Sequence, residues 1–559
     1  MTRTSSNRRD VRTSGPGRGR LQGVPVLLVP AADGGTVQHL AGNGTPTGDR
    51  TPLDTALTAA RPETRWVWAD TAQCYPQLLA AGGRVGRCHD LALTEALLLG
   101  YDGRWGRPRS VAAAWSRLHD LPVPDDVDPG EATAEPTLFE PVRSALPAGV
   151  DPVSAVAAVY ADQLRRIAAT EDPGRFSLLV AAESAGALAA FEMTATGLPW
   201  SAEVHAAKLT ELLGARTSAG VRPARLVELS ALIDAAFEGR RTNPDSPADV
   251  LAAFTAAGRR IESTRSWVLR KVEHPAVEPL LAYKKLARIH AANGWAWQER
   301  WVREGRFRPE YVPGGVVSGR WATRGGGGLQ IPKVLRGAVR ATLGHILVVA
   351  DAGQLEPRLL AALSEDPGMA TAAQAEDMYA AIAARSFGGD RARAKVGLLG
   401  AMYGQVGGQA AAPLAVLRQE YPAALRLLEE AARTGEDGGL VRSHLGRTCP
   451  PVGDDWVRTG PAARARGRFT RNFVVQATAA EWALTWLAVV RSQLTTLDAA
   501  ELVFFAHDEL VVHAPAEASE QVVRILYDGA LEAGRLLFGS TPVRFPLDVS
   551  TVGCYADAG

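Results

Sequence analysis

Cysteine is scarce in this sequence of 559 residues and shows no pattern of metal binding or disulfide pairing. The four cysteines, Cys74, Cys88, Cys449 and Cys554, lie far apart, and none belongs to a Cys-x-x-Cys pair. This spacing argues against a structural zinc site and against a disulfide framework. We therefore expect a protein of a reducing compartment, the cytoplasm.

Long apolar runs are also missing, since no uninterrupted apolar stretch reaches the 18 residues expected of a membrane span. The first twenty residues carry six arginines and one aspartate, without the apolar segment of a secretory signal. We expect residues 1–22 to form a disordered basic tail and the protein to have no membrane partner. The length and a hydrophobic content of 46% allow three or four compact units.

Net charge is nearly absent, at a formal +1, but positive charge is concentrated locally. Residues 284–340 contain twelve lysines or arginines against three glutamates, interleaved with four tryptophans. A solvated protein face normally mixes both signs of charge. The bias therefore favours contact with phosphates over a merely hydrated surface.

The apolar pattern changes along the chain. Residues 23–115 alternate short apolar runs with helical patterns, which predicts an α/β unit. Residues 116–300 are mainly helical in pattern, with a Pro-rich loop near residue 125. A β-type run at 344–351 and a predicted hairpin at 502–515 follow, with a long helical region between them.

Acidic residues stand at the ends of these β-type segments. Asp351 ends the first run, and His507, Asp508 and Glu509 lie at the turn of the hairpin. Asp351 alone is also a good helix cap, and acids are common in polar turns. Together, however, these residues supply carboxylates from two strands, as a two-metal site for phosphoryl transfer requires.

Residues 391–404 carry a stripe with a spacing of four, which predicts one face of a helix. The stripe is Arg391, Lys395, Leu399 and Tyr403. Two cations followed by an apolar and an aromatic side chain match a nucleotide laid along the helix. The alternative is an amphipathic helix with a charged first turn, although arginine early in a helix opposes the helix dipole.

A second stripe with the same spacing consists of Arg468, Asn472 and Gln476. These side chains are long or amide-bearing donors that suit minor-groove acceptors or a templating nucleotide. An exposed helical face explains the stripe equally well.

These patterns, in this order, resemble the motifs of family A DNA polymerases, the group that includes bacterial DNA polymerase I. The segments that carry the resemblance are FEMTATGLPW (191–200), YKKLARIH (283–290), SGRW (318–321), LQIP (329–332), DAGQLEPRLLAALS (351–364), RARAKVGLLGAMYG (391–404), GRFTRNFVVQATAAEWA (467–483) and AHDELVVHAP (506–515). The resemblance covers about residues 190–559.

The resemblance implies an α/β and α+β multidomain fold, Klenow-like and without a 5′ nuclease domain. A degenerate ribonuclease-H-like exonuclease domain is expected at 23–190, followed by a right-hand polymerase with thumb, antiparallel palm sheet and helical fingers. The expected boundaries are 191–315 for the thumb and the start of the palm, 316–370 for the first palm metal motif, 371–478 for the fingers and 479–559 for the second palm metal motif.

The implied function is template-directed addition of dNTPs to the primer of a primer-template DNA, by a monomeric, nucleoid-associated enzyme. The resemblance implies that Asp351 and Asp508 hold two Mg²⁺ ions, supported by Glu509, and that Lys395 protonates the leaving group. The implied nucleotide-binding residues are Arg391, Lys395, Leu399, Tyr403, Glu356, Gln354 and Tyr379, with Glu356 as steric gate. The implied DNA-binding residues are Arg320, Gln330, Arg468, Asn472, Gln476 and His507.

The sequence departs from the family pattern at three positions of the polymerase module. Leu399 and Ala352 stand where aromatic residues are usual, and Tyr379 stands where a histidine often contacts the triphosphate. We expect weaker nucleotide binding and altered tolerance of the sugar or of lesions.

The exonuclease-like region departs further. No Asp-x-Glu follows the first strand, Pro76 stands where the family has aspartate, and Ser184 replaces the last metal ligand. Because these carboxylates would hold the metals, we expect no 3′–5′ exonuclease activity and a structural, duplex-supporting role.

Three alternative functions are considered, each opposed by one feature of the sequence. A catalytically weak DNA-binding scaffold is opposed by the intact Asp351, Asp508 and Lys395. A single-subunit RNA polymerase relative is opposed by Glu356, whose carboxylate would clash with ribose. A nuclease with a vestigial polymerase is opposed by the missing acids. Replication, gap repair and lesion bypass stay open as biological roles.

Overall fold

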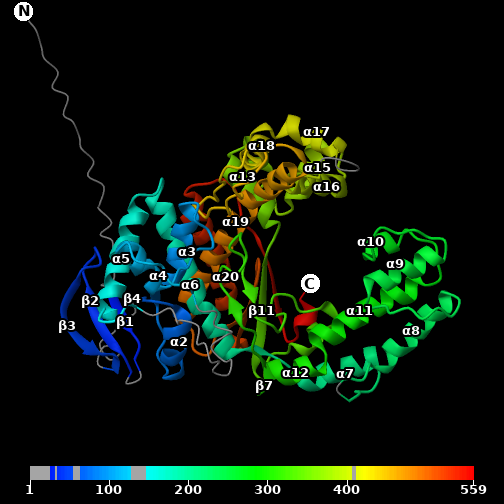
Figure 1. Ribbon diagram of the computed structural model, residues 1–559, viewed down its shortest axis with the longest axis horizontal. Coiled ribbons are helices and arrows are strands. Elements are labelled where there is room, and N and C mark those ends of the chain that lie inside the picture. The colour runs from blue at the N-terminus through cyan, green and yellow to red at the C-terminus, as the bar shows by residue number, and fades with distance from the viewer. Residues whose placement is uncertain are drawn as a thin grey trace, which may run out of the picture.

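The structure is a computed structural model that describes residues 25–31, 34–54, 63–126, 146–218, 220–405 and 411–558. The expected basic tail and part of the Pro-rich loop lie outside these residues. The N-terminal part of the chain, from β1 (Pro25–Val29) to α6 (Pro173–Thr196), is called the front unit below. Figure 1 shows it at the left of a central sheet, from which two helical arms extend.

The front unit contains a five-stranded mixed sheet in the order β3-β2-β1-β4-β5. Its strands are β1 (Pro25–Val29), β2 (Thr36–Leu40), β3 (Pro46–Pro52), β4 (Arg65–Trp68) and β5 (Arg87–Asp90). β1 pairs antiparallel with β2 and parallel with β4, which pairs parallel with β5. The three central residues of β1 are all buried, as expected for a strand covered on both faces.

Five helices accompany this sheet. They are α2 (Thr71–Ala80), α3 (Leu91–Tyr101), α4 (Val111–Leu118), α5 (Pro152–Ala168) and α6 (Pro173–Thr196). Each begins after an Asp or Ser whose side chain accepts a hydrogen bond from a first-turn amide: Asp70, Asp90, Ser110, Asp151 and Asp172. The sheet and helices confirm the α/β unit expected from the sequence.

One arm of the molecule is helical and is built around its own apolar cluster. Its elements are α7 (Ala202–Leu213), α8 (Ala224–Ala236), α9 (Pro247–Ala256), α10 (Ser266–Leu269), α11 (Val277–Asn293) and α12 (Trp295–Trp301). Short strands connect this arm to the centre: β6 (Leu198–Pro199), β7 (Val302–Arg303), β8 (Arg306–Phe307), β9 (Tyr311–Val312) and β10 (Ala322–Thr323).

The central sheet is antiparallel, in the order β12-β13-β11-β14. Its strands are β11 (His345–Ala352), β12 (Glu501–Ala506), β13 (Glu509–Pro515) and β14 (Leu547–Val552). Alternate residues of β11 enter two different apolar clusters, so both faces of the sheet are covered.

The second arm lies above this sheet in Figure 1 and consists of helices. They are α13 (Leu355–Ser364), α14 (Pro367–Ala372), α15 (Met378–Ser386), α16 (Arg391–Tyr403), α17 (Ala411–Glu420) and α18 (Pro422–Glu436). Two long helices, α19 (Gly460–Leu494) and α20 (Ser519–Phe538), pack against one another and against the sheet.

Two helices, α6 and α19, reach the length and hydropathy of a membrane span, a property that the search for uninterrupted apolar runs did not find. However, 67% and 83% of their apolar windows are buried inside the protein. Both are therefore core helices. The expected boundaries at 190 and 478 fall within these same two helices, so each helix is shared by neighbouring units.

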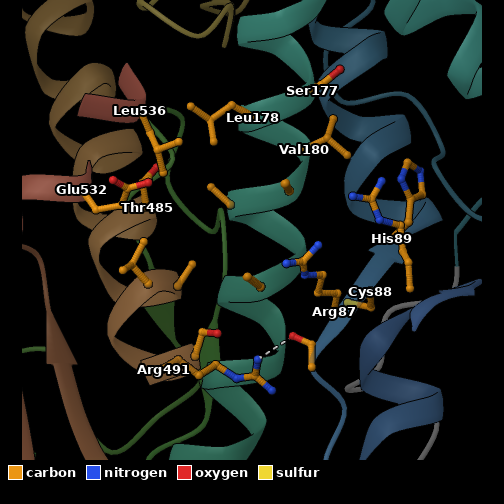
Figure 2. Close-up of a pocket in the computed structure, with 18 of the residues that line it drawn as sticks. Arg87, Cys88, His89, Ser177, Leu178, Val180, Thr485, Arg491, Glu532 and Leu536 are labelled. Atoms are coloured by element: carbon orange, nitrogen blue, oxygen red, sulfur yellow. Dashed lines mark hydrogen bonds between the residues drawn. The ribbon is translucent and has the colours of Figure 1, made fainter. Parts of the chain in front are cut away.

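Buried charges join the front unit to α19. Arg491 of α19 donates to Glu192 of α6 at 2.9 Å and to the carbonyl of Gly86 at 3.0 Å. Figure 2 shows Arg491 and its hydrogen bond to the Gly86 carbonyl at one end of a cleft of about 790 Å³ between β5, α6, α19 and α20. None of the site residues expected from the sequence lines that cleft.

Candidate active site

Carboxylates line one edge of the central sheet. In the strand register, Asp351 of β11 lies opposite Glu509 of β13 on one side and opposite Asp548 of β14 on the other. Register partners in an antiparallel sheet point to the same face, so three acids share one face. Asp508 and His507 form the tight β12–β13 turn, in which His507 has a φ of +62°. The expected hairpin is therefore present.

This arrangement disfavours ionisation of the acids. Burial and the neighbouring carboxylates raise the pKa of Asp351 to about 7, and burial also raises the pKa values of Asp508 and Glu509. Arg320 and Arg336 offset only part of the repulsion. Like charges placed opposite one another destabilise a sheet, so the edge is suited to a bound cation.

The possible metal ligands at this site are carboxylate oxygens, which suit a hard divalent cation. Within the described parts of the chain, no group of three or more His, Cys, Asp or Glu side chains is arranged to hold a metal ion. Mg²⁺ is typically bound through one or two carboxylates, with substrate phosphates and water completing its coordination. Asp351 and Asp508 are consistent with that mode.

Glu509 has a partner that the sequence did not indicate. The hydroxyl of Tyr555 donates to the Glu509 carboxylate, and the guanidinium of Arg336 lies 4.4 Å from the centre of the Tyr555 ring. The hydrogen bond from Tyr555 holds the Glu509 carboxylate in place. Asp548, Arg336 and Tyr555 were all missed because no local motif marks them.

Glu356 of α13 is held from two sides. Arg320 donates to its Oε1 at 2.7 Å, and Tyr403 of α16 donates to its Oε2 at 2.8 Å. The side chain of Asn472 of α19 lies close to the Tyr403 hydroxyl. Burial and Glu356 raise the pKa of Tyr403 to about 12, so its hydroxyl stays a donor. The structure thus brings together residues from four distant segments.

The helix expected from the stripe at residues 391–404 is α16, which begins after the cap Asp390 and ends at Tyr403. Arg391 and Lys395 both lie over the ring of Tyr379, at 5.6 and 5.8 Å from its centre. Figure 1 shows α15 and α16 side by side in the upper arm. The two cations and the tyrosine therefore form one cluster.

Asp377, which the sequence reasoning did not single out, links this cluster to the sheet. Its Oδ2 accepts from Arg391 Nε at 2.6 Å, and its Oδ1 accepts from Gln354 Nε2 at 2.9 Å. Gln354 also accepts from the backbone of Met378 and lies just after β11 in a left-handed conformation. A helix-cap signal in the sequence EDMY was the only hint of Asp377.

The remaining expected residues make fewer contacts. Arg468 packs its side chain against Gly404, whose φ of +71° ends α16. Leu399 is half-buried against the apolar cluster of the upper arm. Among the described residues, the side chains of Gln330 and Gln476 have no hydrogen-bond partner, and neither is joined to the Glu356 cluster.

Arg358 fixes the turn that carries Gln354. Its fully buried guanidinium donates to the carbonyls of Gly353, Ala373, Arg544, Ala375 and Glu376, at distances between 2.6 and 3.1 Å. These carbonyls come from three separate segments. The turn after Asp351 is thereby anchored to the upper arm.

This combination of fold and site defines a class of protein. Residues 224–551, more than half of the chain, match the model of DNA polymerase family A. The chain belongs to that family.

Individual relatives extend the comparison. The chain is 28% identical to DNA polymerase I of Treponema pallidum over 47% of this chain and 29% of that protein. It is 27% identical to the thermostable DNA polymerase I of Thermus aquaticus, over 52% of this chain and 37% of that protein. The matches thus span about a third of the length of these relatives.

A solved structure covers nearly the whole chain. It is the POL domain of Pol1 from M. smegmatis, in complex with DNA primer-template and dNTP, with a TM-score of 0.70 and 18% sequence identity. The match covers 96% of each chain. At this identity it establishes a shared fold, mixed in helix and sheet.

Proposed function

We propose that the protein is a template-directed DNA polymerase that extends a primer with dNTPs. The observation that carries the proposal is the acidic sheet edge at Asp351 and Asp508, together with the cation-bearing helix α16 in a family A chain. A scaffold without catalysis would have no reason to keep three carboxylates in mutual repulsion.

Asp351 and Asp508 are the proposed ligands of two Mg²⁺ ions. When bound, such ions activate the primer 3′-hydroxyl and neutralise the departing pyrophosphate. Glu509 stays in place through Tyr555 and contributes negative charge beside Asp351. Asp548 adds a further charge from the opposite strand, and the raised pKa of Asp351 reflects both neighbours.

Arg391 and Lys395 are the proposed triphosphate contacts. Since Asp377 occupies only Nε of Arg391, both terminal amino groups of the guanidinium are available for phosphate oxygens. Lys395 lies one helical turn further along and would donate a proton to the leaving group. The ring of Tyr379 stabilises both cations through cation–π contacts.

Glu356 is the proposed gate against ribonucleotides. Both of its oxygens are engaged, so the side chain is fixed and cannot move aside at little cost for a 2′-hydroxyl. Arg320, Gln330, Arg468, Asn472, Gln476 and His507 are the proposed DNA contacts. Leu399 lacks the flat face of an aromatic residue, so weaker nucleotide binding follows.

We also propose that the front unit has no proofreading activity. Ser184 Oγ accepts a hydrogen bond from the backbone of Asp90 at 3.2 Å, in the place expected for a metal-binding acid. Asp70 and Asp90 are used as caps of α2 and α3. The first-strand segment up to Ala31 contains no acid, and Asp33 lies outside the described residues.

The test is a primer-extension gel with Mg²⁺ and a labelled primer-template, in parallel lanes with dNTPs, with rNTPs and without nucleotides. Template-matched extension with dNTPs alone and an intact primer in the third lane support the proposal. Absence of extension would favour the scaffold. Shortening of the primer would overturn the proposed loss of exonuclease activity.

A further inference from the structure

A second cavity, of about 310 Å³, lies where the front unit meets the polymerase module. One wall is the loop between α3 and α4, including Trp105, Arg107 and Arg109. The other wall is the segment 314–317 with Arg447. Its size is at the lower end of that of ligand pockets.

Trp105 presents an aromatic face to solvent at the rim of this cavity. Its side chain is 47% exposed, which is unusual for a residue of this size. A Cβ atom on Gly100 would lie 3.5 Å from Trp105 Cδ1, so the indole rests on α3 over this glycine. Among the described residues no aromatic ring or cation stacks on it, and one face remains available.

The same loop carries positive charge without matching acids. Arg107 and Arg109 are exposed, and neither forms an ion pair with any residue that the structure describes. The lining acid, Asp126, already accepts hydrogen bonds from the backbone amides of Arg109 and Ser110. The carboxylate thereby stabilises the loop instead of pairing with the two guanidinium groups.

The loop is held against the polymerase module by specific contacts. The guanidinium of Arg442 lies 4.3 Å from the centre of the Tyr101 ring at the end of α3, and it donates to the Tyr101 carbonyl at 3.3 Å. The opposite wall, 314–317, leads within three residues to Arg320 of the candidate active site. The cavity is therefore fixed in position relative to that site.

We propose that this cavity binds single-stranded DNA, namely the unpaired template ahead of the active site. An exposed indole beside arginines that form no ion pair within the described part of the chain is the combination that stacks bases and neutralises phosphates without reading sequence. The inference rests on the proposed polymerase function and gives the front unit a role in place of proofreading. Trp105 stacks one base, while Arg107 and Arg109 contact the adjoining phosphates.

Fluorescence anisotropy tests the proposal with labelled primer-templates that share one duplex and carry a 5′ template overhang of about 2 or about 12 nucleotides. The unmodified protein should bind the long overhang more tightly. Trp105→Ala should reduce this preference about tenfold, as expected for the loss of one stacked base. Arg107→Gln combined with Arg109→Gln should lower the slope of log affinity against log salt by about 1.4.

The matched control is Arg87→Gln, which removes an exposed arginine of the same unit that lies in the other cleft. It should leave the overhang preference unchanged. A full preference in both Trp105→Ala and the double arginine variant would overturn the proposal. Extension on the short overhang is measured in parallel, so a failure of polymerase activity is seen separately from a failure of overhang binding.

Discussion

The hydroxyl of Tyr403 lies 2.8 Å from Oε2 of Glu356, and this hydrogen bond joins α16 to α13. Arg320 occupies the other carboxylate oxygen at 2.7 Å. A carboxylate held by two donors on different elements has little freedom to rotate. The proposed sugar gate is therefore preorganised before nucleotide arrives.

Changing this gate should alter sugar selection more than overall catalysis. Glu356→Ala removes the carboxylate and should raise the efficiency of ribonucleotide insertion, relative to dNTP insertion, by about tenfold or more. Tyr403→Phe removes only one donor, worth about 1.5–3 kcal/mol when the acceptor is charged, and should have a smaller effect in the same direction. Single-nucleotide insertion kinetics with matched rNTP and dNTP provide the measurement. Unchanged selection in Glu356→Ala would remove the main argument against an RNA polymerase.

Asp377→Asn separates the positioning of Arg391 from helix capping. Asn is as good a cap as Asp, and its Oδ1 can still accept from Gln354, but its amide cannot accept from Arg391 Nε. We expect the KM for dNTP to rise about threefold to tenfold with little change in kcat. The matched control is Glu420→Gln, which removes the negative charge from a comparable exposed contact, Arg385 Nε to Glu420 Oε2, in the same arm. Equal kinetic effects of the two substitutions would contradict a specific role for Asp377.

Glu481 of α19 should make the stability of the protein depend on pH. Burial raises its pKa to about 7, although Ser443 and the Leu445 amide donate to it. Between about pH 4.5 and pH 7 the folded protein holds this proton and the unfolded chain does not. Stability from this group is therefore greatest at the acidic end of that window and falls as pH rises to 7.

Glu481→Gln mimics the protonated acid and should remove about 1–3 kcal/mol of that pH dependence. Urea unfolding midpoints between pH 5 and pH 8 provide the test, with the exposed Glu517→Gln as control. The same slope in all three proteins would show that Glu481 does not carry the effect.

Local signals were sufficient to predict the individual elements of the site. The stripe from Arg391 to Tyr403 coincides with α16, and the apolar runs around His507 and Asp508 form the expected hairpin. In both cases periodicity, a cap or a turn lies within a short stretch of sequence.

Residues that join the site only through tertiary contacts could not be found in this way. Asp548 reaches Asp351 through the pairing of β14 with β11, two strands far apart in the sequence. Asp377 meets Arg391 and Gln354 only when the upper arm packs on the sheet. The helices α6 and α19 continue through the expected domain boundaries because a buried helix can serve two units at once.

The most direct test of the central claim compares the unmodified protein with Asp508→Asn, which keeps the size of the side chain and removes its charge. Primer extension and primer-template binding are measured on the same preparations. The account predicts that extension falls by at least about a thousandfold, as expected for loss of a metal ligand, while the affinity for DNA changes little. Extension at a comparable rate by Asp508→Asn would contradict the two-metal assignment and with it the proposed active site.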